Sequence, residues 1–424
     1  MHIFNIFTFA LIFYLSFCTQ SYGIVVGSDT TVARQRKPKF PSQDVDNTML
    51  GFSVFENGIY LEDSKTTCTF DAFFPIAGIV ELNGGSLHLA HDLKFKNPLQ
   101  LHSGWIYGNG FAVEFPGSSS NVDIPVSLNN VKIFLQSDAT ITEDIMIKKS
   151  CVINCGGYAL SIGDSGSITV ANDSRLHFEN GVIKGLKEDN IRCYDDTGVM
   201  TLDDVVWKQD DDFVFLYGGL IIKNDVVMTG KGSFAYQTSK TFTIASRSSL
   251  LLDSDFTFSY DPIRVASKIL LEFQSDTSRL ILDGATLHAT VTGLQLTRGD
   301  LLVKRDSFLS SEVTSFGEQL IDEGIIFGSG VSENDVRCTI LSGSILELSS
   351  GTLFYDNVNA GSLRMFNERS RLSIASGARL GLYQDITLGK GVLYFSNDTT
   401  FARYPEKKVI GSLDIGGAVV TEVL

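Results

Sequence analysis

The feature that most constrains the fold of this chain is a short motif that returns about every 20 to 30 residues. Each copy places an apolar residue before a polar or glycine corner and a second apolar residue, often β-branched, just after it. Asn and Asp tolerate left-handed backbone angles and Gly adopts them freely, so these residues suit tight corners. We identify corners at Asn130, Asn154, Asn180, Asp204, Asp225, Asp255, Gly284, Asp306, Asn357 and Gly377. The spacing is typical of repeat proteins, in which successive units stack on one another.

Alternating apolar residues precede each corner, as in "SGSITVANDSRLHF" at 165–178. A strand with this alternation buries only one face, and strands of about three to five residues cannot form a stable hairpin by themselves. Both problems are solved if the chain coils, so that each strand pairs in parallel with its counterpart one coil earlier. The inward side chains then stack into one continuous core. The sequence therefore predicts an all-β protein, a single right-handed parallel β-helix of roughly 13 coils at about 25 residues each.

Two other all-β architectures compete with this prediction, a β-sandwich and a β-propeller. A propeller blade needs about 40 or more residues and about four strands. The steps between corners are shorter than that and favour the β-helix. Neighbouring segments that run in opposite directions, within separate sandwiches or blades, would contradict it.

Some stretches of the repeat resemble known families. The segments "GWIYGNGFAVEF" and "VSLNNVKI" within 104–133 are similar to the opening rungs of pectin-lyase-like parallel β-helix proteins. The form "SRLHFENGVIKGL" at 174–186 resembles uncharacterised exported β-helix proteins of bacteria. The resemblance covers most of the mature chain and implies a right-handed parallel β-helix, but its motifs mark fold and not activity.

The first 23 residues have the pattern of a signal peptide. The segment from Ile3 to Phe17 is nearly all apolar, and its fifteen residues are too few for a membrane span of about 20. Ser21 and Gly23 fit the small-x-small rule, so we expect export with cleavage after Gly23, to the periplasm, the cell surface or the medium. Lipid attachment at Cys18 is left open, although Phe17 stands where lipoprotein signals carry a small residue. No later segment is long and apolar enough to span a bilayer.

Residues 24–77 do not fit the repeat, and we interpret them as an N-terminal arm and a cap. The arm carries a basic run at 34–39, which we expect to be solvated. A cap is expected because the open end of a coil exposes core side chains and unpaired strand edges. The β-helix then spans 78–424, with a bulged insertion near 310–337.

The chain has six cysteines, and Cys18 belongs to the signal peptide. The others are Cys68, Cys151, Cys155, Cys193 and Cys338. An odd number leaves at least one thiol unpaired within the chain. Cys151 and Cys155 have the spacing to bridge a corner, but no second Cys or His pair lies nearby to complete a zinc site. We expect buried free thiols and leave the disulfide pairing open.

The chain is acidic, with a net charge of −15 and a pI of about 4.8. A surface with this charge repels a phosphate backbone, so we expect no nucleic-acid partner. The sequence also lacks a Walker loop and a dinucleotide-binding glycine motif. We therefore predict no cofactor and no metal site.

The densest group of carboxylates lies in "LDDVVWKQDDDF" at 202–213. Its members are Asp203, Asp204, Asp210, Asp211 and Asp212. Polysaccharide lyases and glycoside hydrolases need carboxylates for acid–base chemistry or for Ca²⁺, together with a basic residue. Consecutive carboxylates in a strand point to opposite faces, which favours a solvated turn over a catalytic group. The His-Gly and Arg-x-Lys steps that a resemblance to polygalacturonases would imply are absent.

Four aromatic residues are candidates for ligand stacking: Trp105, Tyr107, Trp207 and Tyr217. Such rings stack on the apolar faces of sugars, although packing in the core or at a corner is the more common role.

We expect an exported, monomeric binding or adhesion module whose partner is a glycan or a host or envelope surface. The alternatives are a carbohydrate-active enzyme that uses the carboxylates at 203–212 and a structural spacer of the cell envelope.

Overall fold

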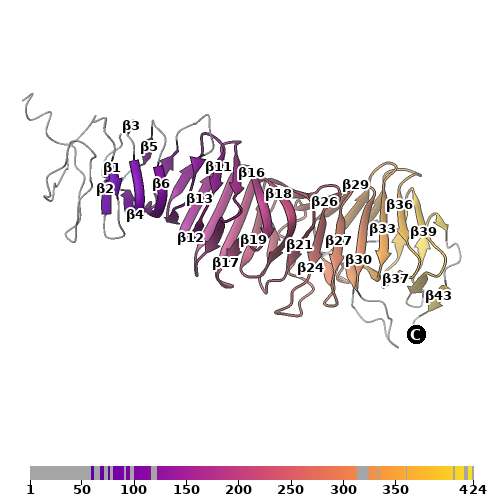
Figure 1. Cartoon of the computed structure of the whole chain (residues 1–424). Helices are drawn as coiled ribbons and strands as arrows, with labels where there is room; N and C mark the ends of the chain where they lie inside the picture. The colour runs from indigo at the N-terminus through magenta and orange to yellow at the C-terminus, as the bar shows by residue number, and fades with distance from the viewer. Residues whose placement is uncertain are drawn as a thin grey trace, which may run out of the picture.

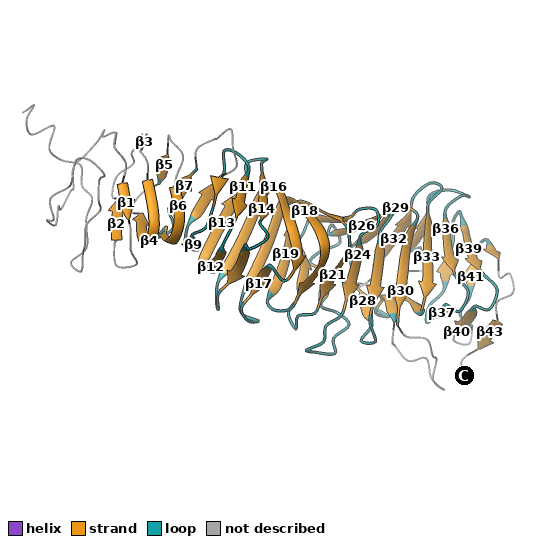
Figure 2. Ribbon diagram, viewed as in Figure 1, coloured by secondary structure: helices purple, strands orange, loops and turns teal. Residues whose placement is uncertain are grey.

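The computed structural model shows a parallel β-solenoid of about 13 turns (Figure 1). The strands run across the long axis of the molecule and stack along it. Strands and loops make up the described part of the chain, in which no α-helix occurs (Figure 2). That part therefore contains no helix able to cross a membrane. The described residues are 59–61, 67–70, 75–76, 80–89, 92–95, 100–115, 122–312, 324–331, 333, 335–359, 361–403, 406–414 and 419–422.

Each coil contributes strands to three faces of the solenoid. β13 (Ser150–Asn154), β14 (Ala159–Ile162) and β15 (Ser167–Val170) follow one another around one coil. In the next coil β16 (Arg175–Glu188) pairs with both β13 and β14, and β17 (Ile191–Cys193) pairs with β15. All strand pairs among the described residues are parallel. The predicted coil is thereby confirmed, and the sandwich and the propeller are excluded for this part of the chain.

Besides its largest sheet, the solenoid contains two smaller sheets. The eight-stranded sheet contains β1 (Ile59–Leu61), β2 (Thr67–Phe70), β4 (Val80–Leu89), β6 (Gln100–Tyr107), β9 (Ser127–Asn129), β12 (Asp144–Lys148), β15 and β17. The six-stranded sheet contains β28 (Leu294–Leu296), β31 (Ile325–Gly328), β34 (Thr352–Asp356), β37 (Arg379–Leu382), β40 (Thr400–Arg403) and β43 (Val419–Glu422). A separate pair consists of β38 (Ile386–Thr387) and β41 (Val409–Ile410).

The largest sheet has 27 strands because β16 and β18 (Val199–Phe215) pass through corners without interruption and pair with strands of more than one face. Its other members are β3 (Pro75–Ile76), β5 (Leu93–Phe95), β7 (Ala112–Glu114), β8 (Val122–Asp123), β10 (Lys132–Phe134), β11 (Ala139–Ile141), β13, β14, β19 (Gly219–Lys223), β20 (Asp225–Gly230), β21 (Ser233–Tyr236), β22 (Phe242–Ile244), β23 (Ser249–Leu252), β24 (Thr257–Tyr260), β25 (Leu271–Phe273), β26 (Arg279–Asp283), β27 (Thr286–Ala289), β29 (Asp300–Arg305), β30 (Ser307–Ser311), β32 (Arg337–Ile340), β33 (Ile345–Ser350), β35 (Leu363–Met365), β36 (Arg371–Ile374), β39 (Val392–Phe395) and β42 (Leu413–Asp414).

The corner at Asn180 and Gly181 shows how the chain turns between two faces. Residues 175–179 of β16 pair with β13, whereas residues 182–184 pair with β14. Asn180 has a φ of 52°, in the left-handed region. A Cβ on Gly181 would lie 2.3 Å from the Cβ of Cys155, so the corner accepts only glycine there. The two halves of this long strand therefore belong to adjacent faces of one coil.

Left-handed backbone is confirmed at the predicted corners Asn130, Asn180, Asp204, Asp255, Gly284 and Gly377. At two others the prediction is wrong by one or two residues. Beside Asp225 the left-handed residue is Asn224, and after Asn154 the left-handed residues are Gly156 and Gly157. The repeat therefore locates the turn, whereas the residue that adopts the left-handed angle varies within it.

Asp306 and Asn357 are corners at which the prediction of left-handed backbone is wrong. Asn357 is fully buried. Its amide Nδ2 donates to the carbonyl of Val336 at 2.9 Å, and its Oδ1 accepts from the Val336 N–H at 3.1 Å. This side chain satisfies backbone groups of the preceding coil, which is a different use of Asn from the one that its position predicts.

The inward side chains of successive coils stack into ladders, and those of the middle coils are aromatic. Phe213, Phe234 and Phe258 occupy equivalent positions in β18, β21 and β24. Their ring centroids are 5.4 and 5.7 Å apart, and each side chain is at most 1% exposed. A second ladder consists of Phe215, Tyr236 and Tyr260. The core is thus continuous from coil to coil, as the alternation predicts.

Four cysteines, Cys151, Cys155, Cys193 and Cys338, are free and buried, as expected. Burial raises the pKa of Cys155, Cys193 and Cys338 to about 12, so these groups are neutral thiols at physiological pH. Cys151 and Cys155 do not form a bridge. The side chain of Cys68 lies outside the described part of the structure.

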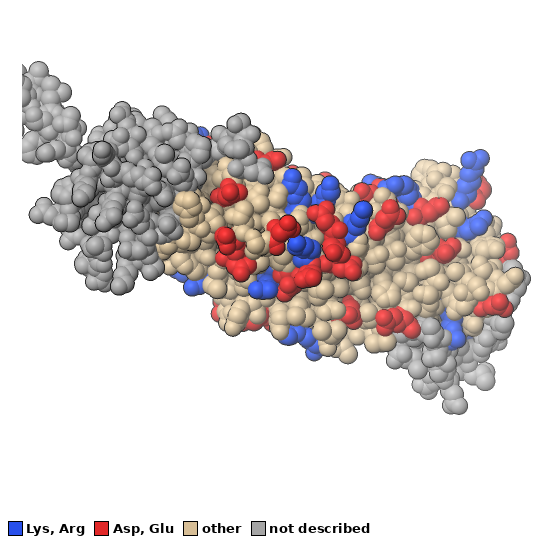
Figure 3. Space-filling view, in the orientation of Figure 1, with Lys and Arg blue, Asp and Glu red and all other residues tan. Residues whose placement is uncertain are grey.

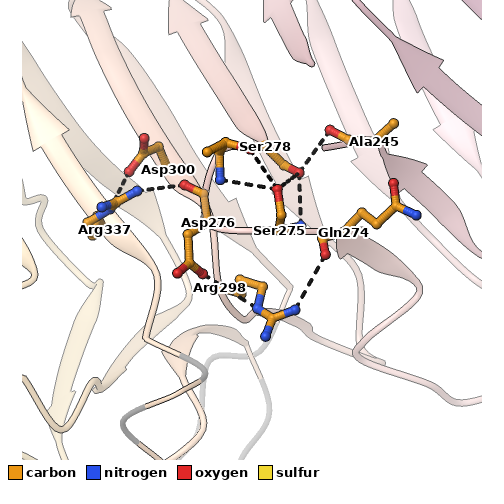
Figure 4. A network of polar contacts seen from close by, with 9 residues as sticks. Ala245, Gln274, Ser275, Asp276, Ser278, Arg298, Asp300 and Arg337 are labelled. Carbon is orange, nitrogen blue, oxygen red and sulfur yellow. Dashed lines mark hydrogen bonds and ion pairs between the residues drawn. The ribbon is translucent and has the colours of Figure 1, made fainter. Parts of the chain in front are cut away.

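Polar side chains at the corners connect neighbouring coils (Figure 4). Arg337 donates to Oδ1 of Asp300 and to the carbonyl oxygen of Asp276, both at 2.6 Å. The Nε of Arg298 lies 3.5 Å from Oδ1 of the same Asp276. These groups span three coils and are paired with one another, so the network holds the coils in register.

Several segments that we identified in the sequence lie wholly or partly outside the described residues. They are the predicted signal peptide, the basic run and most of the predicted cap. Within 24–77, β1 and β2 pair with β4 and β3 pairs with β5, so the parallel ladder is present from Ile59 onward. Residues 313–323 of the predicted insertion, between β30 and β31, are also outside the description.

Candidate functional site

A group of partly exposed rings lies on the outer face of the N-terminal coils, and we call His88, Trp105 and Tyr107 the aromatic platform. Trp105 and Tyr107 both project outward from β6, because Ile106 between them is buried in the core. His88 of β4 is the register partner of Tyr107, and their rings stack with 4.4 Å between centroids and 4° between planes. The centroids of Trp105 and Tyr107 are 5.8 Å apart. Three rings from two adjacent coils therefore form one surface.

Lys148 of β12 also contacts the platform. Its Nζ lies 4.5 Å from the centroid of the Trp105 ring, which is a cation–π contact. Lys148 itself is exposed. Such a contact at an exposed site contributes about 0.5–1 kcal/mol, so an arriving ligand can displace this side chain at small cost.

A hollow of about 600 Å³ opens beside Trp105. Gly84 of β4 and Gly104 of β6 line it, with φ angles of 84° and 122°. The register between β4 and β6 shifts at this point, as expected for a bulge. The bulge and the two missing side chains keep the space open, and the ring of Trp105 forms its apolar wall.

The rim of the hollow is polar. Glu143 and Asp144 are exposed there, and Ser86 and Ser127 are the register partners of Trp105 on its two sides. Asp144 accepts a hydrogen bond from the hydroxyl of Ser167 at 2.6 Å, which fixes one of its two oxygens. The Ser127 hydroxyl accepts from the backbone N–H of Met146 at 2.9 Å. The remaining carboxylate oxygens of the rim are acceptors for the hydroxyl groups of a ligand. An apolar wall with a few converging polar groups is typical of small-molecule and saccharide sites.

His88 is the one member of the platform that carries a titratable ring near neutral pH. Burial against its surroundings holds its pKa below the ordinary value of 6.5. The imidazole that stacks on Tyr107 is therefore neutral at physiological pH. The three rings of the platform are therefore uncharged, and the charged groups beside them are the ammonium of Lys148 and the carboxylates of the rim.

The structure separates the five candidate catalytic carboxylates. Asp203 is only 18% exposed and lies 3.1 Å from Nε2 of His177 in the preceding coil. Asp204 is the exposed left-handed corner next to it. Among the described residues, His177, Glu179 and Asp203 alone bring three ligand-type atoms within 4.8 Å of one another.

The other three carboxylates, at 210–212, are exposed. Asp212 accepts hydrogen bonds from the backbone N–H and the hydroxyl of Ser233, at 2.7 and 2.9 Å. Asp211 accepts from the N–H of Asp212 at 2.8 Å. The bonds from Ser233 connect this part of β18 to the next coil. Acidic and basic side chains lie interspersed over the middle coils on the face shown in Figure 3.

Two of the four candidate stacking residues, Trp207 and Tyr217, do not lie in the platform. Trp207 is fully buried and packs edge-on against Phe213, with 5.1 Å between ring centroids. Tyr217 is partly buried against the core, and the guanidinium of Arg264 lies 3.7 Å from its ring centroid. The ring of Trp207 therefore belongs to the core, and Arg264 occupies one side of Tyr217.

Sequence reasoning missed His88 and the hollow. His88 stands in "GGSLHLAH", in which the alternation of Leu87, His88 and Leu89 already indicates that the histidine faces outward. Its contact with Tyr107 depends on the register between two coils. The two glycines that create the hollow are spaced 20 residues apart and show no motif in the sequence.

Comparison of the chain with family models, curated proteins and solved structures found no match.

Proposed function

We propose that this protein is an exported surface-binding module that holds a neutral saccharide chain on the aromatic platform. The observation that carries the proposal is the combination of stacked outward rings with a hollow lined by polar groups on the same face. The apolar faces of sugar rings stack on aromatic side chains, and their hydroxyl groups donate to carboxylates such as Glu143 and Asp144. A hollow of about 600 Å³ is within the range of natural ligand sites.

The charge of the site indicates which saccharides it accepts. Two carboxylates, those of Glu143 and Asp144, lie at the rim against one ammonium group, that of Lys148, and the whole chain carries a net charge of −15. A polyuronate or a sulfated glycan would be repelled, whereas neutral and amino sugars would not. Neutral or amino-sugar polymers of a cell envelope or host surface are therefore the proposed ligands.

Export is part of the proposal. It is supported by the apolar segment at 3–17, by the small residues around Gly23 and by the resemblance of the segment at 174–186 to uncharacterised exported β-helix proteins of bacteria. An elongated solenoid suits this role, because it presents the platform at one end of a stiff body of about 13 turns. We propose that a single chain is sufficient for binding.

A second candidate function is catalysis on a carbohydrate. The observation in its favour is that His177 lies between the carboxylates of Glu179 and Asp203 on the outer face of the middle coils. Two carboxylates and a basic group are the components of acid–base chemistry on a glycosidic or uronate substrate.

Glycan binding by matched variants tests the proposal. Immobilised neutral, amino and acidic glycans are probed with the wild type, Trp105→Ala, Tyr107→Ala and the control Tyr194→Ala. Tyr194 is 66% exposed and lies outside the platform. We expect binding to neutral or amino-sugar glycans that the two platform variants weaken and the control retains. Silence across all glycans, or equal loss in the control, would contradict the proposal and favour a structural spacer.

A further inference from the structure

A second group of functional side chains lies on a different face of the solenoid from the platform. His177 and Glu179 project outward from β16, because Phe178 between them is fully buried. Asp203 of β18 is the register partner of Glu179 in the next coil. We call His177, Glu179 and Asp203 the histidine–carboxylate cluster.

The imidazole of His177 faces a carboxylate on each of its two nitrogens. Its Nε2 lies 3.1 Å from Oδ2 of Asp203, and its Nδ1 lies 3.4 Å from Oε1 of Glu179. An imidazole nitrogen and carboxylate oxygens are all ligands that zinc accepts. The two carboxylates therefore place zinc-type ligand atoms beside both nitrogens of the ring.

Both carboxylates are oriented by amide groups of neighbouring coils. Asn154 Nδ2 donates to Oε2 of Glu179 at 3.0 Å, and Asn224 Nδ2 donates to Oδ1 of Asp203. One oxygen of each carboxylate is thereby held, while the other is directed toward His177. Hydrogen-bonded supports of this kind orient metal ligands and are typical of the surroundings of metal sites.

The dimensions of the cluster suit a small divalent cation. One ligand atom from each of the three residues lies within 4.8 Å of the others. Zinc bonds to nitrogen and oxygen are about 2.0–2.2 Å long, which places ligand atoms on one ion about 3–3.5 Å apart. A bound ion requires the imidazole and the carboxylates to turn toward one point. The three side chains are 22%, 26% and 18% exposed, so solvent can reach the coordination positions that they leave open.

We propose that the histidine–carboxylate cluster binds a Zn²⁺ ion through one imidazole nitrogen of His177 and one oxygen each of Glu179 and Asp203. Three protein ligands leave a coordination position for water or for an oxygen of a ligand. The imidazole favours zinc over calcium, because calcium takes oxygen ligands almost exclusively. This site is independent of the aromatic platform and of the saccharide proposal.

Calorimetric titration of the metal-stripped full chain with ZnCl₂ tests the site. We expect one zinc ion bound per wild-type chain, and loss of this binding in His177→Ala, Glu179→Gln and Asp203→Asn. Asn154→Ala removes a support and not a ligand, and it should weaken zinc binding by about 10–100-fold. Thermal unfolding without metal shows that each variant is folded, and a rise in the wild-type melting temperature with ZnCl₂ gives a second readout.

Two controls make the result specific. His288 lies 2.8 Å from the hydroxyl of Ser310 and 3.8 Å from one carboxylate, Glu312, so His288→Ala should leave zinc binding unchanged. Trp105→Ala should also leave it unchanged, which separates this site from the platform. With CaCl₂, binding should be weaker in the wild type and should not depend on His177.

Three outcomes would overturn the zinc site. The first is the absence of heat and of thermal stabilisation with ZnCl₂ up to millimolar concentration, which would mean that the cluster is an ion-pair ladder only. The second is full zinc affinity in His177→Ala. The third is an equal loss in His288→Ala, which would indicate non-specific binding to surface histidines.

Discussion

The solenoid contains two stacks of aromatic rings that differ in the side of the strand from which they project. Phe213, Phe234 and Phe258 stack inward with no more than 1% exposure. In the platform, His88 and Tyr107 stack in the same coil-to-coil manner on the outer face. Rings at equivalent positions of the repeat thus stack whether they project into the core or outward from the solenoid. Inward rings stabilise the core, whereas outward rings are accessible to a ligand.

The two tryptophans of the chain show the same contrast. Trp105 lies beside a hollow created by Gly84 and Gly104, whereas Trp207 is enclosed by Phe213 and Phe234. The difference arises from the local backbone. The bulge between β4 and β6 leaves space beside Trp105, whereas the corner at 203–204 directs Trp207 into the core. Residue type alone therefore does not indicate a binding role.

Truncation of the inner stack should have the largest effect. Phe234→Ala removes a fully buried ring that contacts Trp207, Phe213 and Phe258, and we expect a loss of about 3–5 kcal/mol in the free energy of unfolding. Denaturant unfolding followed by far-UV circular dichroism measures it. The exposed control Tyr194→Ala should change stability by less than about 0.5 kcal/mol. Similar values for the two variants would remove the distinction between inner and outer rings.

Closing the space inside a corner should have the next largest effect. In Gly181→Ala the new Cβ would lie 2.3 Å from the Cβ of Cys155 and 2.5 Å from the carbonyl of Tyr158, and we expect a loss of about 1–3 kcal/mol. Gly389→Ala is the matched control, because its Cβ would meet nothing within 4 Å. Equal melting temperatures for the two variants would show that the corner is not packed as described.

Truncation of the outer stack should affect binding more than stability. Trp105→Ala or Tyr107→Ala should each weaken saccharide binding by about 0.5–1.5 kcal/mol, a factor of about 2–12 in Kd. The free energy of unfolding should change by much less than in Phe234→Ala, because these rings are partly exposed. A platform variant that unfolds as readily as Phe234→Ala would mean that the platform is a structural element.

The smallest expected effect is a pH dependence that arises from His88. Burial lowers its pKa in the folded protein below 6.5, so the unfolded chain binds more protons in the pH range between the two values. Stability should therefore be unaffected by this group above pH 6.5 and should fall as the pH drops toward the lowered value. NMR titration of the imidazole and unfolding of His88→Gln check the prediction. A titration midpoint at or above 6.5 would contradict it.

The sequence predicts the architecture well because corners and alternation are local signals. Asn180 and Gly181 mark a turn of the coil through the conformations that only such residues accept. The outward direction of Trp105 and the inward direction of Trp207 are harder to predict. At Asp203 and Asp204 two residues separate the buried Leu202 from the buried Val205, so the alternation restarts with the opposite parity after the corner.

The two sites depend on the register between coils, which no local pattern in the sequence reveals. His177 and Asp203 are 26 residues apart, whereas His88 and Tyr107 are partners at a shorter step. Because the step changes from coil to coil, a side chain cannot be paired with its neighbour by counting. This explains why Asp203 was identified as a candidate without His177 and Glu179.

Fluorescence of the two tryptophans, taken one at a time, tests the binding role of the platform most directly. The chain contains two tryptophans, so Trp207→Phe leaves Trp105 as the emitting group and Trp105→Phe leaves Trp207. Titrated with the neutral or amino-sugar oligosaccharide found by glycan probing, the Trp207→Phe protein should show a saturable change in emission, and the Trp105→Phe protein should show none. An unchanged Trp105 signal in a protein that still binds the oligosaccharide would contradict the account.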